Sequence, residues 1–285
     1  MTLISNLIVA SSNHRLEENI SYDTDPFQKL DLYTPINPSN QLEPLLIYVH
    51  GGAWRSGDKA EGTNQVLIDS LSIRFPKWSI STINYRLSIG THPVIHPAHN
   101  QDVSKAVNFL LNRSNPQYDR TRIYLLGHSV GAFICLSISG ILSNNDPSSI
   151  IQTPKSVIGL GLLDGIYGLR ELIQEYPDYI DFVQEAIGPD GQPNDWQTVS
   201  PLHWSLSTSN FPISSKLLII HSKDDSLLST KQTDLFVNHL NQLVKTQSNG
   251  PKLLLEPDLT SVIGDHDELL GSNQLADRIV KWLNP

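Results

Sequence analysis

Short, almost uninterrupted apolar runs recur along the chain and are separated by segments with other patterns. The runs occupy residues 45–49, 122–127, 157–163, 216–221 and 252–256, with a β-prone stretch at 78–85. Strands buried on both faces of a parallel sheet have this kind of sequence. Apolar side chains at helical spacing follow several of the runs, at 102–112, just after 131, at 230–244 and at 274–283. This alternation predicts an α/β fold, with a mostly parallel central sheet and helices on both faces.

Three other stretches are less regular. Residues 28–33 alternate polar and apolar side chains and end before Pro35, which predicts an edge strand. Residues 1–27 are polar and irregular after a short apolar start, and they indicate no chemistry. Residues 169–211 combine helix-like patches with turns. Because the strand pattern resumes directly afterwards, we expect one domain over 1–285 with a small cap-like insertion at about 169–211.

The sequence Gly127-His128-Ser129-Val130-Gly131 lies between a β-prone run and a helical segment. It fits the pattern G-x-S-x-G, and strand, tight turn and helix form the context of a nucleophile elbow. Glycines on either side of the serine allow strand and helix to approach closely. The pattern alone also occurs as an ordinary turn between core elements, so the assignment depends on agreement from other parts of the chain.

A second segment follows the run at 45–49 and consists of five consecutive residues: His50, Gly51, Gly52, Ala53 and Trp54. In a hydrolase with a nucleophile elbow, backbone N–H groups of such a glycine-rich loop form part of an oxyanion hole. The residue after the nucleophile supplies the remaining donor. The predicted donors are therefore Gly52, Ala53 and Val130, and His50 is expected to hold the loop in place.

An acid and a histidine complete the pattern. Asp224 and Asp225 follow the run at 216–221, and we favour Asp225 because it directly precedes the segment leading into the next helix. His266 lies between the last strand and the last helix. The order Ser129, Asp225, His266 is that of α/β hydrolases. A serine activated by an imidazole that a carboxylate orients performs acyl transfer to water, so ester, thioester or amide hydrolysis is predicted.

Composition narrows the range of partners. The net charge of −9 disfavours nucleic acids and anionic membranes. The one cysteine, Cys135, lies in an apolar helical segment and is expected to be a buried packing residue, and a reducing, cytoplasmic location is the simplest interpretation. His92, His96 and His99 stand close together, but no carboxylate pair or further cysteine accompanies them, and we expect no metal there. The sequence leaves open whether the chain forms a homodimer.

With these residues assembled, the chain resembles the kynurenine formamidase family, fungal type, from about residue 30 to the C-terminus. The resemblance is carried by His50–Trp54, by residues 127–134, by the stretches 165–167, 169–172 and 175–177, and by the segments around Asp225 and His266. It implies an α/β-hydrolase fold and hydrolysis of N-formyl-L-kynurenine to L-kynurenine and formate in tryptophan breakdown. It also implies Ser129, Asp225 and His266 as the triad, and no cofactor.

The substrate is less fixed than the chemistry. Four aromatic residues are candidates to stack on the substrate ring, although each is also an ordinary packing residue: Trp54, Tyr85, Tyr167 and Trp204. Ser226 follows the acid where the fungal enzymes are expected to carry an acidic residue. A general small-acyl carboxylesterase is therefore the main alternative. A non-catalytic α/β-hydrolase-like protein that binds a small molecule is the alternative from another class.

Overall fold

The computed structural model describes residues 13–90, 93–143, 156–191, 194–206, 214–246 and 252–284. In this part of the chain an eight-stranded sheet has the order β1-β2-β4-β3-β5-β7-β9-β10. Its strands are β1 (His14–Ser21), β2 (Lys29–Pro35), β3 (Leu45–Val49), β4 (Ser79–Ile83), β5 (Ile123–His128), β7 (Val157–Leu163), β9 (Ser214–Ile220) and β10 (Lys252–Asp258). The short β6 (Leu142–Ser143) and β8 (Ser205–Leu206) pair separately.

All pairings from β4 to β10 are parallel, whereas β1 pairs with β2 and β2 with β4 in antiparallel fashion. The predicted mostly parallel sheet is confirmed. The strand predicted at 28–33 is present as β2, but its predicted edge position is wrong, since β1 covers the outer side of β2. The strand β1 lies within residues 1–27, for which the sequence predicted no particular element. Of its side chains only that of His14 is buried, so its sequence carries no apolar pattern that could reveal it.

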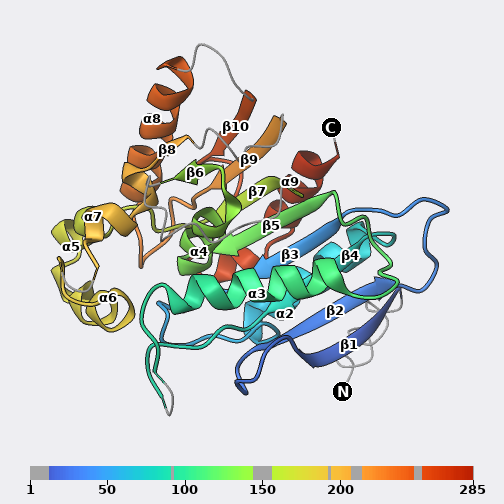
Figure 1. The fold of residues 1–285 in the computed structure, drawn as a ribbon. Coiled ribbons are helices and arrows are strands. Elements are labelled where there is room, and N and C mark those ends of the chain that lie inside the picture. The colour runs from blue at the N-terminus through green and yellow to red at the C-terminus, as the bar shows by residue number, and fades with distance from the viewer. Residues whose placement is uncertain are drawn as a thin grey trace, which may run out of the picture.

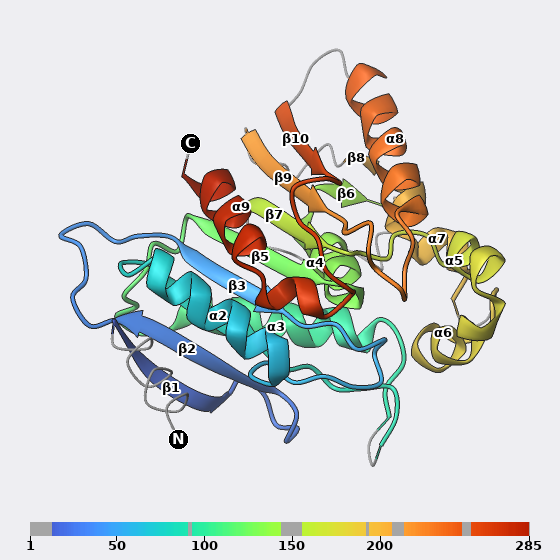
Figure 2. The same cartoon turned by 180° about the vertical axis from the view of Figure 1, so that it is seen from behind.

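Helices cover both faces of the sheet (Figures 1 and 2). One apolar core joins the sheet to α3 (Ala98–Asn112), α4 (Val130–Ser139) and α8 (Lys231–Thr246), and a second joins it to α2 (Gly62–Arg74) and α9 (Asn273–Leu283). In β3, residues 45, 47 and 49 face the first core while 46 and 48 face the second. This explains the uninterrupted apolar run. The helix α2 was not predicted, and α3 begins four residues before the expected start at 102.

The predicted cap-like segment forms short helices at one end of the sheet, drawn in yellow at the left of Figure 1. They are α5 (Leu169–Glu175), α6 (Ile180–Ile187) and α7 (Trp196–Val199), with 3₁₀ turns at Pro177–Tyr179 and Pro201–His203. The Tyr179 hydroxyl donates to the Leu227 carbonyl at 2.7 Å, and the Ser229 amide donates to the Tyr176 hydroxyl at 2.8 Å. These bonds tie the segment to the loop after β9. Residues 192–193 and 207–211 of the predicted segment lie outside the described residues, as does His92.

The strand order brings three chain segments together. β5, β7 and β9 are neighbours, with His128 paired to Leu163 and Leu163 paired to Ile220. The residues that follow these strands therefore leave the sheet side by side at its carboxyl edge, where ligands of open α/β sheets bind. Within the described residues, no helix has the length and apolar character needed to cross a bilayer.

Candidate active site

Ser129 occupies the tight turn between β5 and α4, in the predicted strand-turn-helix context. Its backbone has φ 55° and ψ −121°, a combination that non-glycine residues adopt only under strain. A Cβ added to Gly127 would lie 2.4 Å from the Gly131 carbonyl oxygen, and one on Gly131 would lie 2.2 Å from the Val49 oxygen. Both glycines are therefore required by close backbone approach. The Ser129 amide donates to the Leu163 carbonyl at 2.8 Å, which fixes the turn against β7.

The loop after β3 lies directly against this turn. A Cβ on Gly51 would be 2.9 Å from the Ser129 Cβ. The next three residues all have positive φ, with 99° at Gly52, 52° at Ala53 and 57° at Trp54. A left-handed run that includes alanine and tryptophan is strained, and such strain is concentrated at functional sites. The loop therefore lies against the Ser129 turn, and the oxyanion hole at Gly52, Ala53 and Val130 stays a prediction.

Two buried rings hold this loop. His50 Nδ1 donates to the Gly51 carbonyl at 2.8 Å, and its ring stacks on Tyr85 with centroids 4.5 Å apart. The Tyr85 hydroxyl lies 3.1 Å from the His50 oxygen and 3.2 Å from the Gly51 oxygen. Burial lowers the pKa of His50 to about 4, so this histidine is neutral at physiological pH. The geometry agrees with the expected role of His50 in holding the loop.

Asp225, rather than Asp224, contacts the histidine of the last loop. His266 Nδ1 donates to Asp225 Oδ2 over 2.6 Å. The second oxygen, Oδ1, accepts the amides of Leu227 at 2.9 Å and Leu228 at 2.8 Å. The Asp225 side chain is fully buried, whereas Asp224 is exposed. The sequence-based preference for Asp225 thus corresponds to the carboxylate that can orient His266.

Electrostatics within this pair favour an ionised acid and a strong base. Burial alone would raise the pKa of Asp225, but hydrogen bonds from His221 and His266 and the charge of His266 hold it well below its usual value. Burial would lower the pKa of His266, but the hydrogen bond that it donates to Asp225 and the charges of Asp225 and Asp164 raise it above its usual value. His221 Nε2 lies 3.4 Å from Asp225 Oδ2 and adds a second cationic neighbour when protonated.

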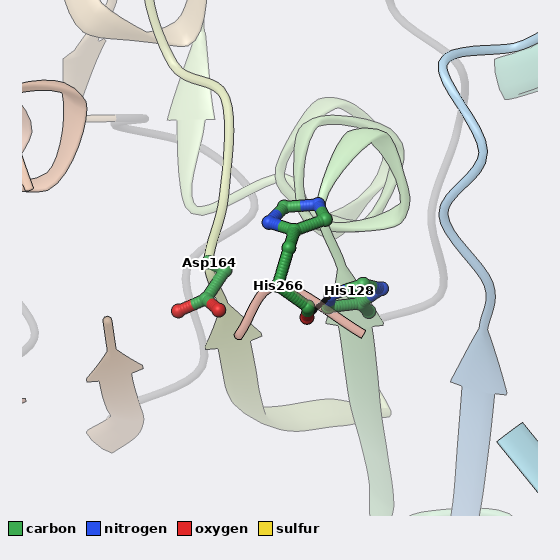
Figure 3. Close-up of side chains that lie close together, drawn as sticks. All are labelled: His128, Asp164 and His266. Carbon is green, nitrogen blue, oxygen red and sulfur yellow. Dashed lines mark hydrogen bonds between the residues drawn. The ribbon is translucent and has the colours of Figure 1, made fainter. Parts of the chain in front are cut away.

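Two side chains beside His266 were not singled out from the sequence, and Figure 3 draws them with it. His128 Nε2 donates to the His266 carbonyl at 2.9 Å, and the two rings lie 4.7 Å apart. His266 is therefore held next to the residue that precedes Ser129. Asp164, the first residue after β7, is fully buried, and its Oδ1 accepts the Ser222 amide at 2.9 Å. Both residues stand at carboxyl ends of buried strands, but this position alone did not mark them as site residues.

The acid loop and the histidine loop are joined to each other. The Ser226 amide donates to Asp265 Oδ1 at 2.8 Å, and the Ser222 hydroxyl donates to the Gly264 carbonyl at 2.6 Å. These bonds connect the segments on either side of the contact between Asp225 and His266. Asp225 and His266 are thus held in place by both loops that carry them, as a preorganised catalytic pair requires.

Several of these groups come close enough to suggest a metal site, in the combinations His128, Asp164 and His266, and Asp164, His221 and Asp225. Hydrogen bonds already engage the histidines. His221 Nδ1 lies 2.7 Å from the Thr233 hydroxyl, and Nε2 lies 2.8 Å from the Leu228 oxygen. The clusters have the chemistry of a hydrogen-bonded acid–base network.

Cys135 is buried, which raises the pKa of its thiol, and this agrees with the expected packing role.

The four aromatic candidates for substrate contact occupy different places. The Trp54 ring packs edge-on against Phe133, with centroids 5.5 Å apart, and leads toward α6 through Phe182 at 6.3 Å. Tyr85 braces the loop, and Tyr167 stacks on Phe236 at 4.3 Å in the core. Trp204 Nε1 donates to the Thr198 carbonyl at 2.6 Å. Each ring has packing partners within the fold, and contact with a substrate stays a prediction for all four.

Comparison with known proteins identifies relatives of this chain. The family model BD-FAE matches residues 30–240. A kynurenine formamidase from Meyerozyma guilliermondii is 31% identical over 229 residues, which make up 78% of this chain and 79% of that protein. One from Scheffersomyces stipitis is 31% identical over 249 residues, 79% of this chain and 87% of that protein.

Solved structures that resemble this fold include esterases. A truncated carbohydrate esterase from gut microbiota has a TM-score of 0.69 at 18% identity and covers 94% of each chain. Carboxyl esterase 2 from Tuber melanosporum has a TM-score of 0.67 at 21% identity, over 95% of this chain and 84% of that one. These likenesses confirm the predicted α/β-hydrolase fold.

Proposed function

Because the chain belongs to the kynurenine formamidase family of α/β hydrolases, we propose that it hydrolyses N-formyl-L-kynurenine to L-kynurenine and formate. The hydrogen bond of 2.6 Å between His266 and Asp225, beside the strained elbow at Ser129, carries the proposed mechanism. The choice of substrate is supported by relatives that are similar over most of both chains. The proposed setting is tryptophan breakdown in the cytoplasm, a location that the single cysteine favours.

In the proposed mechanism the Ser129 hydroxyl attacks the formyl carbon while His266 Nε2 takes its proton. The amides of Gly52, Ala53 and Val130 stabilise the oxyanion that forms. Asp225 keeps the proton of His266 on Nδ1 and stabilises the imidazolium. The C–N bond then breaks, and His266 returns its proton to the leaving aromatic amine. Water, activated by the same imidazole, cleaves the formyl ester of Ser129 and releases formate.

The reaction suits this kind of site for two chemical reasons. A formyl group carries only hydrogen on its acyl carbon, so it needs no large acyl pocket beside Ser129. The leaving group is an aryl amine, which is a weaker base than an alkyl amine and is easier to expel. The site therefore needs only one acid–base residue, His266, to complete both half-reactions.

A small-acyl carboxylesterase is the second candidate, favoured by the esterases that share the fold and by Ser226 after the acid. The test compares kcat/KM of the purified protein on N-formyl-L-kynurenine and on p-nitrophenyl acetate. A clear preference for the formamide supports the proposal. Activity on the ester alone keeps the serine mechanism and rejects the formamide as substrate.

A non-catalytic binding protein is distinguished by covalent labelling. A fluorophosphonate reagent reacts with a serine only where a base activates it. We expect one equivalent of label on Ser129, located by peptide mass spectrometry. A protein that stays unlabelled at Ser129 while folded would be a binding module rather than an enzyme.

A further inference from the structure

Asp164 stands at the centre of the carboxyl edge of the sheet. It follows β7, between the strand that delivers Ser129 and the strand that leads to Asp225. Its backbone has φ 43°, so it shares with Ser129, Ala53 and Trp54 a left-handed conformation that non-glycine residues rarely adopt. Its amide donates to the Ile220 carbonyl at 2.9 Å, which fixes the residue in this position.

The surroundings of its carboxyl group are unusual for an aspartate. The side chain is fully buried, Oδ1 accepts the Ser222 amide at 2.9 Å, and Oδ2 has no hydrogen-bond partner. A carboxylate oxygen of Asp164 lies within 4.8 Å of a ring nitrogen of both His128 and His266. Five titratable groups face it, from four segments: His128, Tyr167, His221, Asp225 and His266. No cation lies in hydrogen-bond contact with it among the described residues.

We propose that Asp164 is a second carboxylate of the active site, a positioning residue that shares with Asp225 the electrostatic stabilisation of protonated His266. This inference rests on the proposed role of His266 as the base. Asp225 acts through a direct hydrogen bond, whereas Asp164 acts through its charge across the buried space beside the ring. It also holds the Ser222 turn that leads to Asp225, through Oδ1.

The physical basis is the low polarity of the site. Desolvation raises the pKa of Asp164 to about 7, against the opposing effects of His221 and the Ser222 amide. The group is therefore protonated more readily than an exposed aspartate. When the imidazolium of His266 forms during the reaction, the positive charge favours the ionised form of Asp164, and the ionised form in turn stabilises the imidazolium.

The variant Asp164→Asn separates charge from structure. Asparagine keeps an Oδ1 that accepts the Ser222 amide and has nearly the same shape, but it carries no charge. Because a nearby carboxylate raises the pKa of His266, its removal shifts the acid limb of kcat/KM toward lower pH. Each unit by which the pKa of His266 falls weakens the stabilisation of its protonated form about tenfold. The value of kcat/KM on the plateau above the acid limb is therefore expected to fall by up to about tenfold.

Asp267→Asn is the matched control. Its carboxylate lies 4.0 Å from His128 Nδ1 and also raises the pKa of His266, but its side chain is 71% exposed. Solvent screens it, so its removal is expected to move the acid limb much less than Asp164→Asn does. Equal shifts from both variants, or an unchanged acid limb in Asp164→Asn, would overturn the proposal and leave Asp164 a structural residue.

The profiles are measured with p-nitrophenyl acetate on the full chain, so the inference does not depend on the formamide being the substrate. A wild-type protein that hydrolyses neither substrate would reject the proposed function itself, whereas an active wild type with an unmoved Asp164→Asn profile rejects only the inference. If asparagine at 164 prevents folding, Asp164→Ser supplies a smaller neutral side chain for the same measurement. An unmoved acid limb in that variant is equally contradictory.

Discussion

Replacing Asp225 by asparagine should inactivate the site by changing the tautomer of its base. Oδ1 of Asp225 accepts the amides of Leu227 and Leu228, so an asparagine will keep its oxygen there. Its NH₂ group then faces His266 Nδ1, which must become an acceptor. The ring proton moves to Nε2, where it blocks acceptance of the Ser129 proton.

The magnitude follows from the geometry of the pair. Unit charges separated by the 2.6 Å of this bond attract by about 6 kcal/mol at an effective dielectric constant of about 20. At about 1.4 kcal/mol per tenfold change, this sets an upper limit of roughly four to five orders of magnitude. Part of the bond is already present with neutral His266, so we expect kcat to fall about 10³- to 10⁴-fold.

The assay measures kcat of Asp225→Asn and Asp224→Asn on both substrates, with circular dichroism to establish that each variant is folded. Asp224 is exposed and adjacent in sequence, so Asp224→Asn should change kcat less than about twofold and serves as the control. A loss of less than about tenfold in folded Asp225→Asn would refute the reasoning. An equal loss in both variants would show that the contact between Asp225 and His266 is not what matters.

Two further predictions concern the elbow and the base. Gly131→Ala places a Cβ 2.2 Å from the Val49 oxygen and should lower the free energy of unfolding by about 2 kcal/mol or more. In the control variant Gly271→Ala the Cβ would be 3.8 Å from its nearest neighbour, so the free energy of unfolding should change by less than about 0.5 kcal/mol. Urea denaturation measures both values. Similar values for the two variants would contradict the close approach at the elbow. Because the pKa of His266 is raised above 6.5 and the base must be neutral, kcat/KM should decline as pH falls through a value above 6.5. A profile that stays flat down to pH 6 would contradict the raised pKa.

Part of the fold was predictable because the physics is local. Strands buried on both faces must be apolar throughout, so β3 and β7 are visible as continuous runs. The elbow was predictable because close approach of β5 and α4 requires glycine at 127 and 131. By contrast, β1 exposes most of its side chains, and α2 has only a weak apolar stripe, so neither has a readable pattern.

Asp164 could not be identified as a site residue from sequence for a different reason. Its importance depends on β7 lying between β5 and β9, and strand order is a property of the whole sheet. The choice of Asp225 over Asp224 was predictable because Asp225 directly precedes the segment that leads into α8. The contact between His221 and Asp225 could not be predicted from sequence, because it depends on how the turn after β9 folds back.

The most direct test of the account follows the absorbance change of N-formyl-L-kynurenine hydrolysis with the wild-type protein and Ser129→Ala at equal concentration. The account predicts formation of L-kynurenine and formate in equal amounts by the wild type. It also predicts the loss of nearly all turnover in a folded Ser129→Ala variant. Substantial residual turnover in the variant, or none in the wild type, would contradict the account.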